Sequence, residues 1–383
     1  MFGRIGFRGY TADDLVEAGA GAITLSPTNI IDGELDFTNC SYLSWEKYYE
    51  SPEIMVKAGD VVLVKTASVG KCALVRSLPK ETTVNPQFLV FKNIEANSAF
   101  FTYVLQDYVQ CFLDSEKNGS TIPTISQQTI GNFKIMLPPR SEQDAIVRYL
   151  DAATSKIDKA IAMQQKMIDL LNERKKIIIQ NAVTKGLDEN VEMKDSGVEW
   201  IGMIPKHWKI IRIKHLAKLQ SGSNLTSNEI SDTGSYPVYG GNGLRGFYGS
   251  YNCEGSYVLI GRQGALCGNI NYAEDKFWAT EHAVVCYPKK KYNTLWFGEV
   301  LRLMDLGQYS LASAQPGLAV ERIKGLYMPY PSIEEQNKIA LFLKQNIGKI
   351  DLYARHCQRQ ITLLQERKQI IINEVVTGKV KVS

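Results

Sequence analysis

A glycine-rich stretch at residues 241–246, GNGLRG, has the spacing of the dinucleotide-binding fingerprint G-x-G-x-x-G. That chemistry needs a helix to begin at the glycines, because its first N–H groups hold the pyrophosphate. The next residues, Phe247–Tyr251, indicate further loop and strand instead of an amphipathic helix. Gly70-Lys71 likewise lacks the upstream glycine of a phosphate-binding loop. We therefore expect no nucleotide site at either place.

Two other stretches suggest catalysis without completing a catalytic set. Asn85–Phe88 reads NPQF and resembles the Asn-Pro-Pro-Phe/Tyr motif of amino-methyltransferases. However, Gln87 replaces the second proline, and no glycine loop for S-adenosylmethionine precedes it. His282 follows Glu281, yet no nucleophile stands at a recognisable spacing from this pair. We expect a strand entry at the first stretch and a core or loop histidine at the second, so the chain shows no convincing chemistry of its own.

The elements that position these loops follow from an internal repeat. Residues 138–184 and 331–377 align without a gap at a constant separation of 193 residues, and they agree at 20 of 47 positions. In each copy the expected helix follows a proline, Pro138 or Pro331, and has Ser141 or Ser332 as its expected N-cap. After these N-caps, no proline or glycine other than Gly348 interrupts either copy. Each should therefore form a helix of about 40 residues, or roughly 60 Å at 1.5 Å per residue.

Apolar residues in both copies recur on two heptad positions, which predicts a seam between two long helices. The natural partner of each helix is the other one, because the two halves are equivalent, and a pseudo-twofold axis would make them antiparallel. An ordinary amphipathic core helix is the alternative interpretation. The residues expected in this seam, or in docking a partner, are Ile157, Ile161, Ile168, Leu171, Ile178, Ile350, Ile361, Leu364 and Ile371.

The two segments outside the helices also share a similar pattern of predicted strands and helices. Strand-like runs punctuated by glycine and proline accompany one helical stretch in each, Phe100–Leu113 and Leu295–Leu306. We predict an α+β fold in which two globular mixed α/β domains are separated by two long antiparallel helices that form a coiled coil. The predicted boundaries are 1–136 for the first domain, 137–186 for the first helix, 187–206 for a linker, 207–330 for the second domain and 331–383 for the second helix.

The whole-chain composition excludes several classes of protein. With 383 residues the chain is long for one core, and its formal charge of +4 gives no argument for nucleic-acid binding without a local basic patch. The seven cysteines form no C-x-x-C pair, a pattern typical of reduced thiols in a cytoplasm, and four scattered histidines do not favour structural zinc. No signal peptide opens the chain and no apolar run approaches the roughly 18 residues of a membrane span. We expect a cytoplasmic protein without membrane contact.

The repeated motifs resemble those of a known family. PPRSEQDAI and PSIEEQNKI, LLNERK and LLQERK, IIIQNAVTKG and IIINEVVTGK, and the lead-in SGVEWIGMIPKHW are similar to the specificity subunit of type I restriction-modification systems. The resemblance covers essentially the whole chain. It implies a non-catalytic protein with two target-recognition domains, each reading one half of an asymmetric bipartite DNA site.

The resemblance also implies the partners, which are double-stranded DNA, the modification (M) subunits that dock on the helices, and the restriction (R) subunits that join them. S-adenosylmethionine, ATP and Mg are then expected in those partner subunits, with no cofactor in this chain. Arginine would read guanine, asparagine or glutamine would read adenine, and lysine, serine and threonine would hold phosphates. The candidate DNA-contacting residues are Arg4, Arg8, Lys65, Thr66, Ser68, Lys71, Asn242, Arg245, Arg262, Gln263 and Asn269.

The start of the chain departs from the family pattern. The first domain of the family usually opens with a lead-in like Trp200–Leu219, whereas this chain starts almost at Gly3. By this internal comparison we expect about twenty to forty residues of the usual start to be absent.

Two hypotheses from other classes stay open. The chain could be a stand-alone methyltransferase or nuclease, or a coiled-coil scaffold that joins two modules unrelated to DNA.

Overall fold

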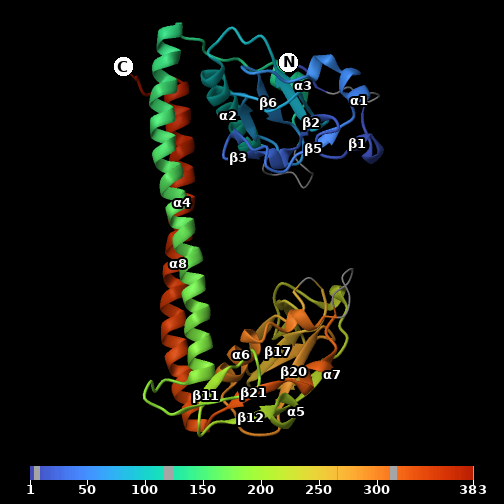
Figure 1. Ribbon diagram of the computed structural model, residues 1–383, viewed down its shortest axis with the longest axis vertical. Coiled ribbons are helices and arrows are strands. Elements are labelled where there is room, and N and C mark those ends of the chain that lie inside the picture. Colours follow the sequence, from blue (N-terminus) through green and yellow to red (C-terminus); the bar gives the residue numbers. More distant parts are fainter. Residues whose placement is uncertain (4–8, 116–123, 265, 311–316, 383) are drawn as a thin grey trace. The chain divides into compact units, whose positions relative to one another are not determined.

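The structure is a computed structural model that describes residues 1–3, 9–115, 124–264, 266–310 and 317–382. The chain divides into two compact units, one made of residues 1–164 and 359–383 (unit 1) and the other of residues 165–358 (unit 2). Two long helices contribute a segment to each unit, α4 (Arg140–Lys185) and α8 (Ile333–Val376) (Figure 1). Each unit is therefore a globular domain together with two helical segments.

The domain of unit 1 is built on small sheets and one longer helix. A three-stranded antiparallel sheet has the order β7-β6-β9, and a four-stranded sheet has the order β1-β5-β2-β8. Its strands are β1 (Leu15–Val16), β2 (Ala22–Leu25), β3 (Ile30–Ile31), β4 (Glu34–Leu35), β5 (Ser41–Leu43), β6 (Val61–Val64), β7 (Cys72–Leu74), β8 (Thr82–Val84) and β9 (Phe88–Phe91), and its helices are α1 (Trp45–Tyr49), α2 (Ser98–Ser115) and α3 (Gln127–Gly131).

The sequence explains why the core of unit 1 lies between a sheet and α2. All four residues of β6 are buried, as expected for an apolar run covered on both faces. Helix α2 begins where the side chain of Asn97 accepts hydrogen bonds from the N–H groups of Ala99 and Phe100, at 2.9 and 3.3 Å. Its apolar side chains Leu105 and Val109 then pack in one cluster with β6 and β9. The predicted helix at this place is confirmed.

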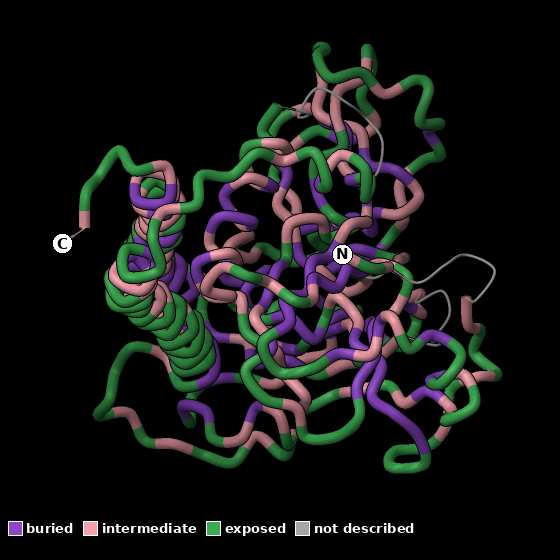
Figure 2. The backbone as a smooth tube through the Cα atoms, turned by 90° about the horizontal axis from the view of Figure 1, so that it is seen from above, coloured by how far each residue is buried: buried purple, intermediate pink, exposed green. Residues whose placement is uncertain are grey.

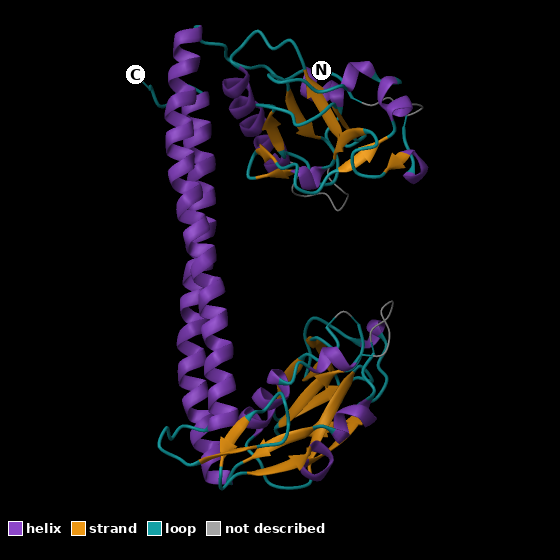
Figure 3. Cartoon of the chain, viewed as in Figure 1, coloured by secondary structure: helices purple, strands orange, loops and turns teal. Residues whose placement is uncertain are grey.

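The domain of unit 2 repeats this plan with more strands. One four-stranded sheet has the order β13-β20-β17-β18 and the other has the order β15-β14-β19-β16. Figure 3 shows the strands of this domain in orange, beside the long helices in purple. Its strands are β10 (Met193–Asp195), β11 (Met203–Pro205), β12 (Lys209–Arg212), β13 (Ala217–Ser221), β14 (Tyr236–Gly240), β15 (Gly243–Tyr248), β16 (Cys253–Glu254), β17 (Tyr257–Gly261), β18 (Ile270–Ala273), β19 (Lys276–Ala279), β20 (Ala283–Pro288) and β21 (Tyr327–Tyr330), and its helices are α5 (Ile213–Leu216), α6 (Thr294–Leu303) and α7 (Val320–Gly325).

Three expectations about local structure need correction. The helix expected over Leu295–Leu306 ends at Leu303, because Asp305 adopts a left-handed backbone conformation with φ of 45°. The predicted linker is partly ordered, since β10 and β11 form an antiparallel hairpin that places Ile204 in the core of unit 2. Ser141 is not an N-cap, because α4 already begins at Arg140, directly after the two prolines.

The helical segments pair within each unit, which confirms the prediction of two long antiparallel helices. In unit 1, Ile146 and Leu150 near the start of α4 pack in one cluster with Val375 and Val376 at the end of α8. In unit 2, Ile179 and neighbours near the end of α4 share the core with residues near the start of α8. The two helices comprise 46 and 44 residues and are exposed over much of their surface (Figure 2). Within the described residues, neither they nor any other helix has an apolar stretch suited to crossing a bilayer.

Candidate nucleic-acid interface and helix anchors

The hairpin that joins β17 to β18 in unit 2 exposes two of the predicted DNA-contacting residues, Arg262 and Gln263. Its backbone is fixed, because the N–H of Arg262 donates to the His282 carbonyl and the Arg262 carbonyl accepts from Leu318, each at 2.8 Å. The guanidinium of Arg262 donates to the Ser221 hydroxyl at 3.3 Å and stays exposed. Backbone hydrogen bonds thus hold Arg262 in place with its side chain exposed, next to the exposed Gln263.

The hairpin that joins β6 to β7 in unit 1 is held in the same way. The carbonyl of Lys65 accepts a hydrogen bond from the N–H of Ile125 at 2.9 Å, and Thr66 forms a β-bridge with Thr124. In unit 2, the corresponding bridge joins Gln263 to Gly317, which lies 193 residues after Thr124 and so at the repeat separation. The two domains therefore present equivalent hairpins, and three candidates of unit 1, Lys65, Thr66 and Ser68, lie on one of them.

Lys71 lies at the base of this hairpin and already has partners inside the domain. Its ammonium group donates to the carbonyls of Pro27 and Ile30, at 3.0 and 3.1 Å. These two bonds tie Lys71, directly before β7, to Pro27 and to Ile30, the first residue of β3. A contact between Lys71 and DNA remains a prediction, and two of its three donors are occupied.

The remaining candidates of unit 2 are brought partly together. The amide of Asn269 donates to the amide oxygen of Asn242 at 3.3 Å, which joins the β17–β18 hairpin to the turn between β14 and β15. Arg245 lies on β15, with its guanidinium 3.4 Å from the Ser227 hydroxyl. The four candidates Asn242, Arg262, Gln263 and Asn269 thus share one group of loops. Arg4 and Arg8 lie outside the described residues.

Glycine has a structural reason in these loops that is unrelated to nucleotide binding. A Cβ atom added to Gly261 would lie 2.1 Å from the carbonyl oxygen of Gly241, so glycine alone lets the two loops approach this closely. The stretch 241–246 continues into strand β15 and no helix begins there. The expectation of loop and strand after these glycines is confirmed.

One buried glutamine joins each domain to a long helix, and sequence reasoning missed both. In unit 1, Gln143 of α4 accepts a hydrogen bond from the N–H of Asn97 at 2.7 Å and donates to the Pro138 carbonyl at 2.8 Å. Asn97 in turn donates from its side chain to Asp144 at 2.7 Å. Because Asn97 also caps α2, this group fixes the start of α4 against the start of α2.

The same arrangement recurs in unit 2, one repeat later. Gln336 of α8 accepts from the N–H of Asn293 at 2.9 Å and donates to the Pro331 carbonyl at 3.1 Å. Asn293 caps α6 and donates from its side chain to Asn337 at 2.9 Å. The sequence signal for these glutamines was the Glu-Gln pair that both copies of the repeat keep. Such conservation between the copies is unexpected in the first turn of a helix if the residue is exposed, because any polar residue would be tolerated there.

The predicted seam residues lie in the paired helical segments. Lys175 and Asp351 form an ion pair of 2.8 Å inside unit 2, and Lys368 and Asp158 form one of 2.7 Å inside unit 1. Near the end of each repeat, a lysine, Lys175 or Lys368, therefore occupies one of the two heptad positions that form the seam. All nine predicted residues are buried or half-buried, namely Ile157, Ile161, Ile168, Leu171, Ile178, Ile350, Ile361, Leu364 and Ile371.

Comparison with known proteins decides which family this arrangement belongs to. The profile of the type I restriction modification DNA specificity domain matches the chain twice, over residues 10–167 and 205–363. The chain belongs to the type I restriction-modification specificity family.

Known specificity subunits align with this chain over most of their length. The type I restriction enzyme EcoprrI specificity subunit of Escherichia coli is 28% identical over 331 residues, which cover 80% of this chain and 77% of the relative. The MjaVIII specificity subunit of Methanocaldococcus jannaschii is 25% identical over 364 residues, covering 86% and 81%. A chain from a solved structure on complex assembly and conformational transition of the type I R-M system has the same fold, with a TM-score of 0.70, 15% identity and coverage of 94% and 92%.

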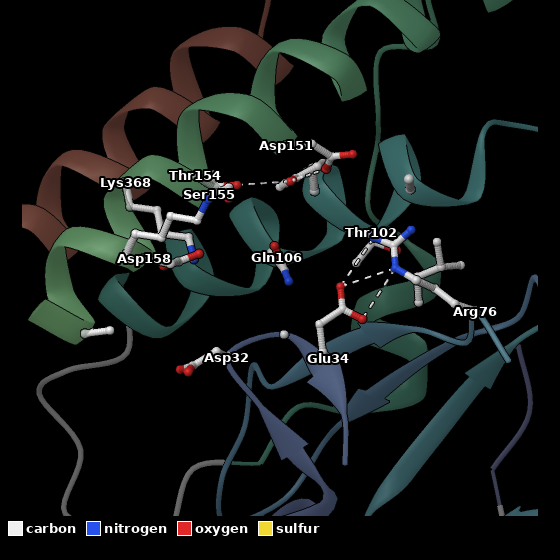
Figure 4. Close-up of a pocket in the computed structure, with 16 residues that line it drawn as sticks. Asp32, Glu34, Arg76, Thr102, Gln106, Asp151, Thr154, Ser155, Asp158 and Lys368 are labelled. Carbon is white, nitrogen blue, oxygen red and sulfur yellow. Dashed lines mark hydrogen bonds and ion pairs between the residues drawn. The ribbon is translucent and has the colours of Figure 1, made fainter. Parts of the chain in front are cut away.

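A polar cavity of about 530 Å³ lies inside unit 1 of the specificity subunit, between the domain and the helical segments (Figure 4). Its charged groups are largely paired with one another: Glu34 with Arg76 at 3.3 Å, and Asp158 with Lys368. The Tyr103 hydroxyl donates to Asp151 at 2.7 Å, and burial raises the pKa of Tyr103, so this phenol stays a donor. These pairs and hydrogen bonds link the domain to the helical segments around the cavity.

Two cysteines of the specificity subunit lie in the cores of its domains. Burial raises the pKa of the Cys72 and Cys286 thiols, both fully enclosed in their cores. His282 lies 3.1 Å from Glu281, beside the hairpin of Arg262. In the part of the chain that the structure describes, no group of three His, Cys, Asp or Glu side chains is arranged to hold a metal ion.

Proposed function

We propose that this specificity subunit recognises an asymmetric bipartite site in double-stranded DNA, with each domain reading one half through its β-hairpin. The observation that carries the proposal is the pair of equivalent hairpins, held by the same backbone contacts and bearing different side chains. Thr66 and Ser68 lie on one, Arg262 and Gln263 on the other. Since different donors and acceptors match different base edges, equal frames with unequal side chains imply unequal half-sites.

Assembly with modification subunits fits the outer surface of the long helices. Apolar side chains are exposed there at positions that the repeat duplicates. Leu170 and Ile177 are 50% and 51% exposed on α4, and their counterparts Leu363 and Ile370 are 46% and 56% exposed on α8. Isolated exposed apolar residues need no explanation, but a stripe present twice indicates two equivalent binding surfaces. We propose that each surface docks one modification subunit and that restriction subunits join this assembly.

Chemistry then belongs to the partner subunits, and this chain supplies recognition and spacing. S-adenosylmethionine, ATP and Mg would be bound by those partners. The burial of the Cys72 and Cys286 thiols and the ion pairs of Glu34 and Asp158 fit this division between subunits. A stand-alone methyltransferase or nuclease would instead bind S-adenosylmethionine, or cut DNA, as the purified chain alone.

The deciding experiment is the map of methylated positions made by the chain assembled with its modification subunits. The expected motif is split into two unlike halves separated by a fixed number of unspecified base pairs. A continuous motif, or methylation independent of this chain, would overturn the proposal. For docking, Leu170→Glu combined with Leu363→Glu should lower co-purification of the modification subunit, whereas Lys166→Glu on an exposed position of α4 should not.

A further inference from the structure

One further loop of each domain is bonded directly to the proposed DNA-reading hairpin. In unit 1 the loop from β8 to β9 contains Gln87, whose carbonyl accepts a hydrogen bond from the N–H of Lys65 at 2.7 Å. In unit 2 the loop from β19 to β20 contains His282, whose carbonyl accepts from the N–H of Arg262 at 2.8 Å. Each loop therefore lies directly beside the hairpin of its own domain.

Strand pairing shows that the two loops are equivalent. Strand β8 pairs parallel with β2, and β19 pairs parallel with β14. Directly after β8, the N–H of Asn85 donates to the Leu25 carbonyl at 2.9 Å. Directly after β19, the N–H of Thr280 donates in the same way to the Tyr239 carbonyl, also at 2.9 Å. The two loops thus occupy the same place in the two domains, although their side chains differ.

The side chain of Asn85 fixes which end of the Gln87 amide is left for a ligand. Its oxygen Oδ1 accepts from the backbone N–H of Gln87 at 2.9 Å, and a backbone N–H can only donate. Its nitrogen Nδ2 therefore lies toward Gln87 Oε1, to which it donates at 3.0 Å. Within the described residues, Nε2 of Gln87 has no hydrogen-bond partner and is not enclosed. Gln87 thus presents the two hydrogens of its amide nitrogen as donors.

We infer that Gln87 reads a keto oxygen on a base next to those contacted by the hairpin of unit 1, and that Asn85 is its positioning residue. In the major groove guanine O6 and thymine O4 accept hydrogen bonds, whereas cytosine N4 and adenine N6 donate them. An amide nitrogen held in this orientation matches guanine and thymine, and it meets the amino groups of cytosine and adenine donor to donor. This inference rests on the proposed function, since it needs the hairpin to lie on DNA.

The loop of unit 2 holds an unlike side chain at the same place. The carboxylate of Glu281 lies 3.1 Å from Nε2 of His282, and because a carboxylate only accepts, this ring nitrogen carries the hydrogen. The other ring nitrogen of His282, Nδ1, has no partner in the part of the chain that the structure describes, so it is left for a base edge. Gln87 and His282 are therefore different groups at equivalent places, as two unequal half-sites require. The stretches Asn85–Phe88 and Glu281-His282, which suggested catalysis without completing it, then serve recognition.

Two variants should reverse this specificity by different routes. Asn85→Asp keeps the shape of the side chain but offers only acceptors, so the Gln87 amide turns over and presents Oε1. Gln87→Glu presents a carboxylate oxygen from the same place. Both should replace guanine or thymine by cytosine or adenine at one position of the motif methylated by the chain with its modification subunits. On duplexes that differ at that base pair alone, the assembled complex should prefer the new base by roughly five- to 150-fold, the discrimination expected of a good base contact.

Asn93→Asp is the matched control, because it adds the same charge at an exposed asparagine of unit 1 and should leave the motif unchanged. His282→Ala should alter a position of the other half-site only. If Asn85→Asp lowers the urea midpoint of the chain, Gln87→Glu alone decides. An unchanged motif, or a position that accepts all four bases, would overturn the inference and leave the proposed function standing. A continuous motif made by the unchanged chain would instead overturn the proposed function, and the inference with it.

Discussion

Lys368 donates to both carboxylate oxygens of Asp158, at 2.7 and 2.8 Å, inside unit 1. The same pair occurs in unit 2 with the helices exchanged, where Lys175 donates to Asp351 at 2.8 Å. Each residue lies 193 positions from its counterpart, so the internal repeat generates one ion pair twice. Such pairs fix the register of two antiparallel helices, because a slip by one heptad would leave each lysine opposite another residue.

Charge reversal at Lys368 should therefore weaken the helix pair of unit 1. Both side chains are partly exposed, so we expect Lys368→Glu to lower the free energy of unfolding by about 1 kcal/mol, which includes the new repulsion. The exchanged pair Asp158→Lys with Lys368→Asp should recover most of this loss. Urea unfolding of the three proteins measures it, and a double variant no more stable than Lys368→Glu would contradict a direct pairing.

The glutamine anchors should be the more costly residues of the repeat. Gln336→Ala removes the acceptor of the Asn293 N–H and leaves that partly buried donor unpaired, which costs about 1–3 kcal/mol. Gln165→Ala is the matched control, because this glutamine is also kept in both copies but is exposed on α4. Its effect should stay within about 0.5 kcal/mol. Equal losses of unfolding free energy in the two variants would remove the anchoring role.

Periodicity and repetition predicted the helices well, because a heptad pattern kept over some forty residues has few alternative structures. The pairing of the two copies followed from their equivalence alone. The roles of Gln143 and Gln336 could not be predicted, since their partners Asn97 and Asn293 lie more than forty residues away in sequence. The partners of loop residues could not be predicted either. The charge of Lys71 suggested a phosphate contact, whereas its ammonium group already donates to two backbone carbonyls.

The acid stability of unit 2 should depend on Glu335. Burial alone would raise the pKa of this carboxyl, but hydrogen bonds from Trp208, His207 and Ser332 outweigh it and lower the pKa from 4.5 to about 2. A carboxyl whose pKa is lowered by folding stabilises the folded state at any pH above its pKa in the unfolded chain. The contribution of Glu335 is therefore complete above about pH 4.5 and is lost as the pH falls toward 2.

Glu335→Gln should thus lower the urea midpoint at pH 7 and flatten its decrease between pH 5 and 3. Glu142→Gln is the matched control, since this repeat counterpart is exposed and its carboxylate accepts no such bond from any residue that the structure describes. A decrease as steep in Glu335→Gln as in the unchanged chain would assign the pH dependence to other carboxyls.

Arg262 offers a direct test of the hairpin as a reader of bases. If its guanidinium contacts a base edge, Arg262→Ala should weaken binding of the assembled methyltransferase to its cognate duplex by about 1–3 kcal/mol, with little change on a scrambled duplex. Thr66→Ala in the equivalent hairpin should act through the other half-site. An equal loss on both duplexes would make Arg262 a phosphate contact, and no loss on either would remove it from the interface.

The length of the paired helices should set the spacing of the two half-sites. Each long helix passes from one unit to the other, α4 after Gln164 and α8 after Gln358. Inserting one heptad at both places keeps the apolar seam in phase and adds about 10 Å of helix, the length of about three base pairs. The methylated motif should keep both half-sites and gain about three unspecified base pairs between them. An insertion in α4 alone would shift Lys175 away from Asp351 and should destabilise the chain without producing a new motif. Unchanged spacing after the double insertion would contradict a rigid helical spacer, and an altered half-site would show that the helices contribute to base recognition.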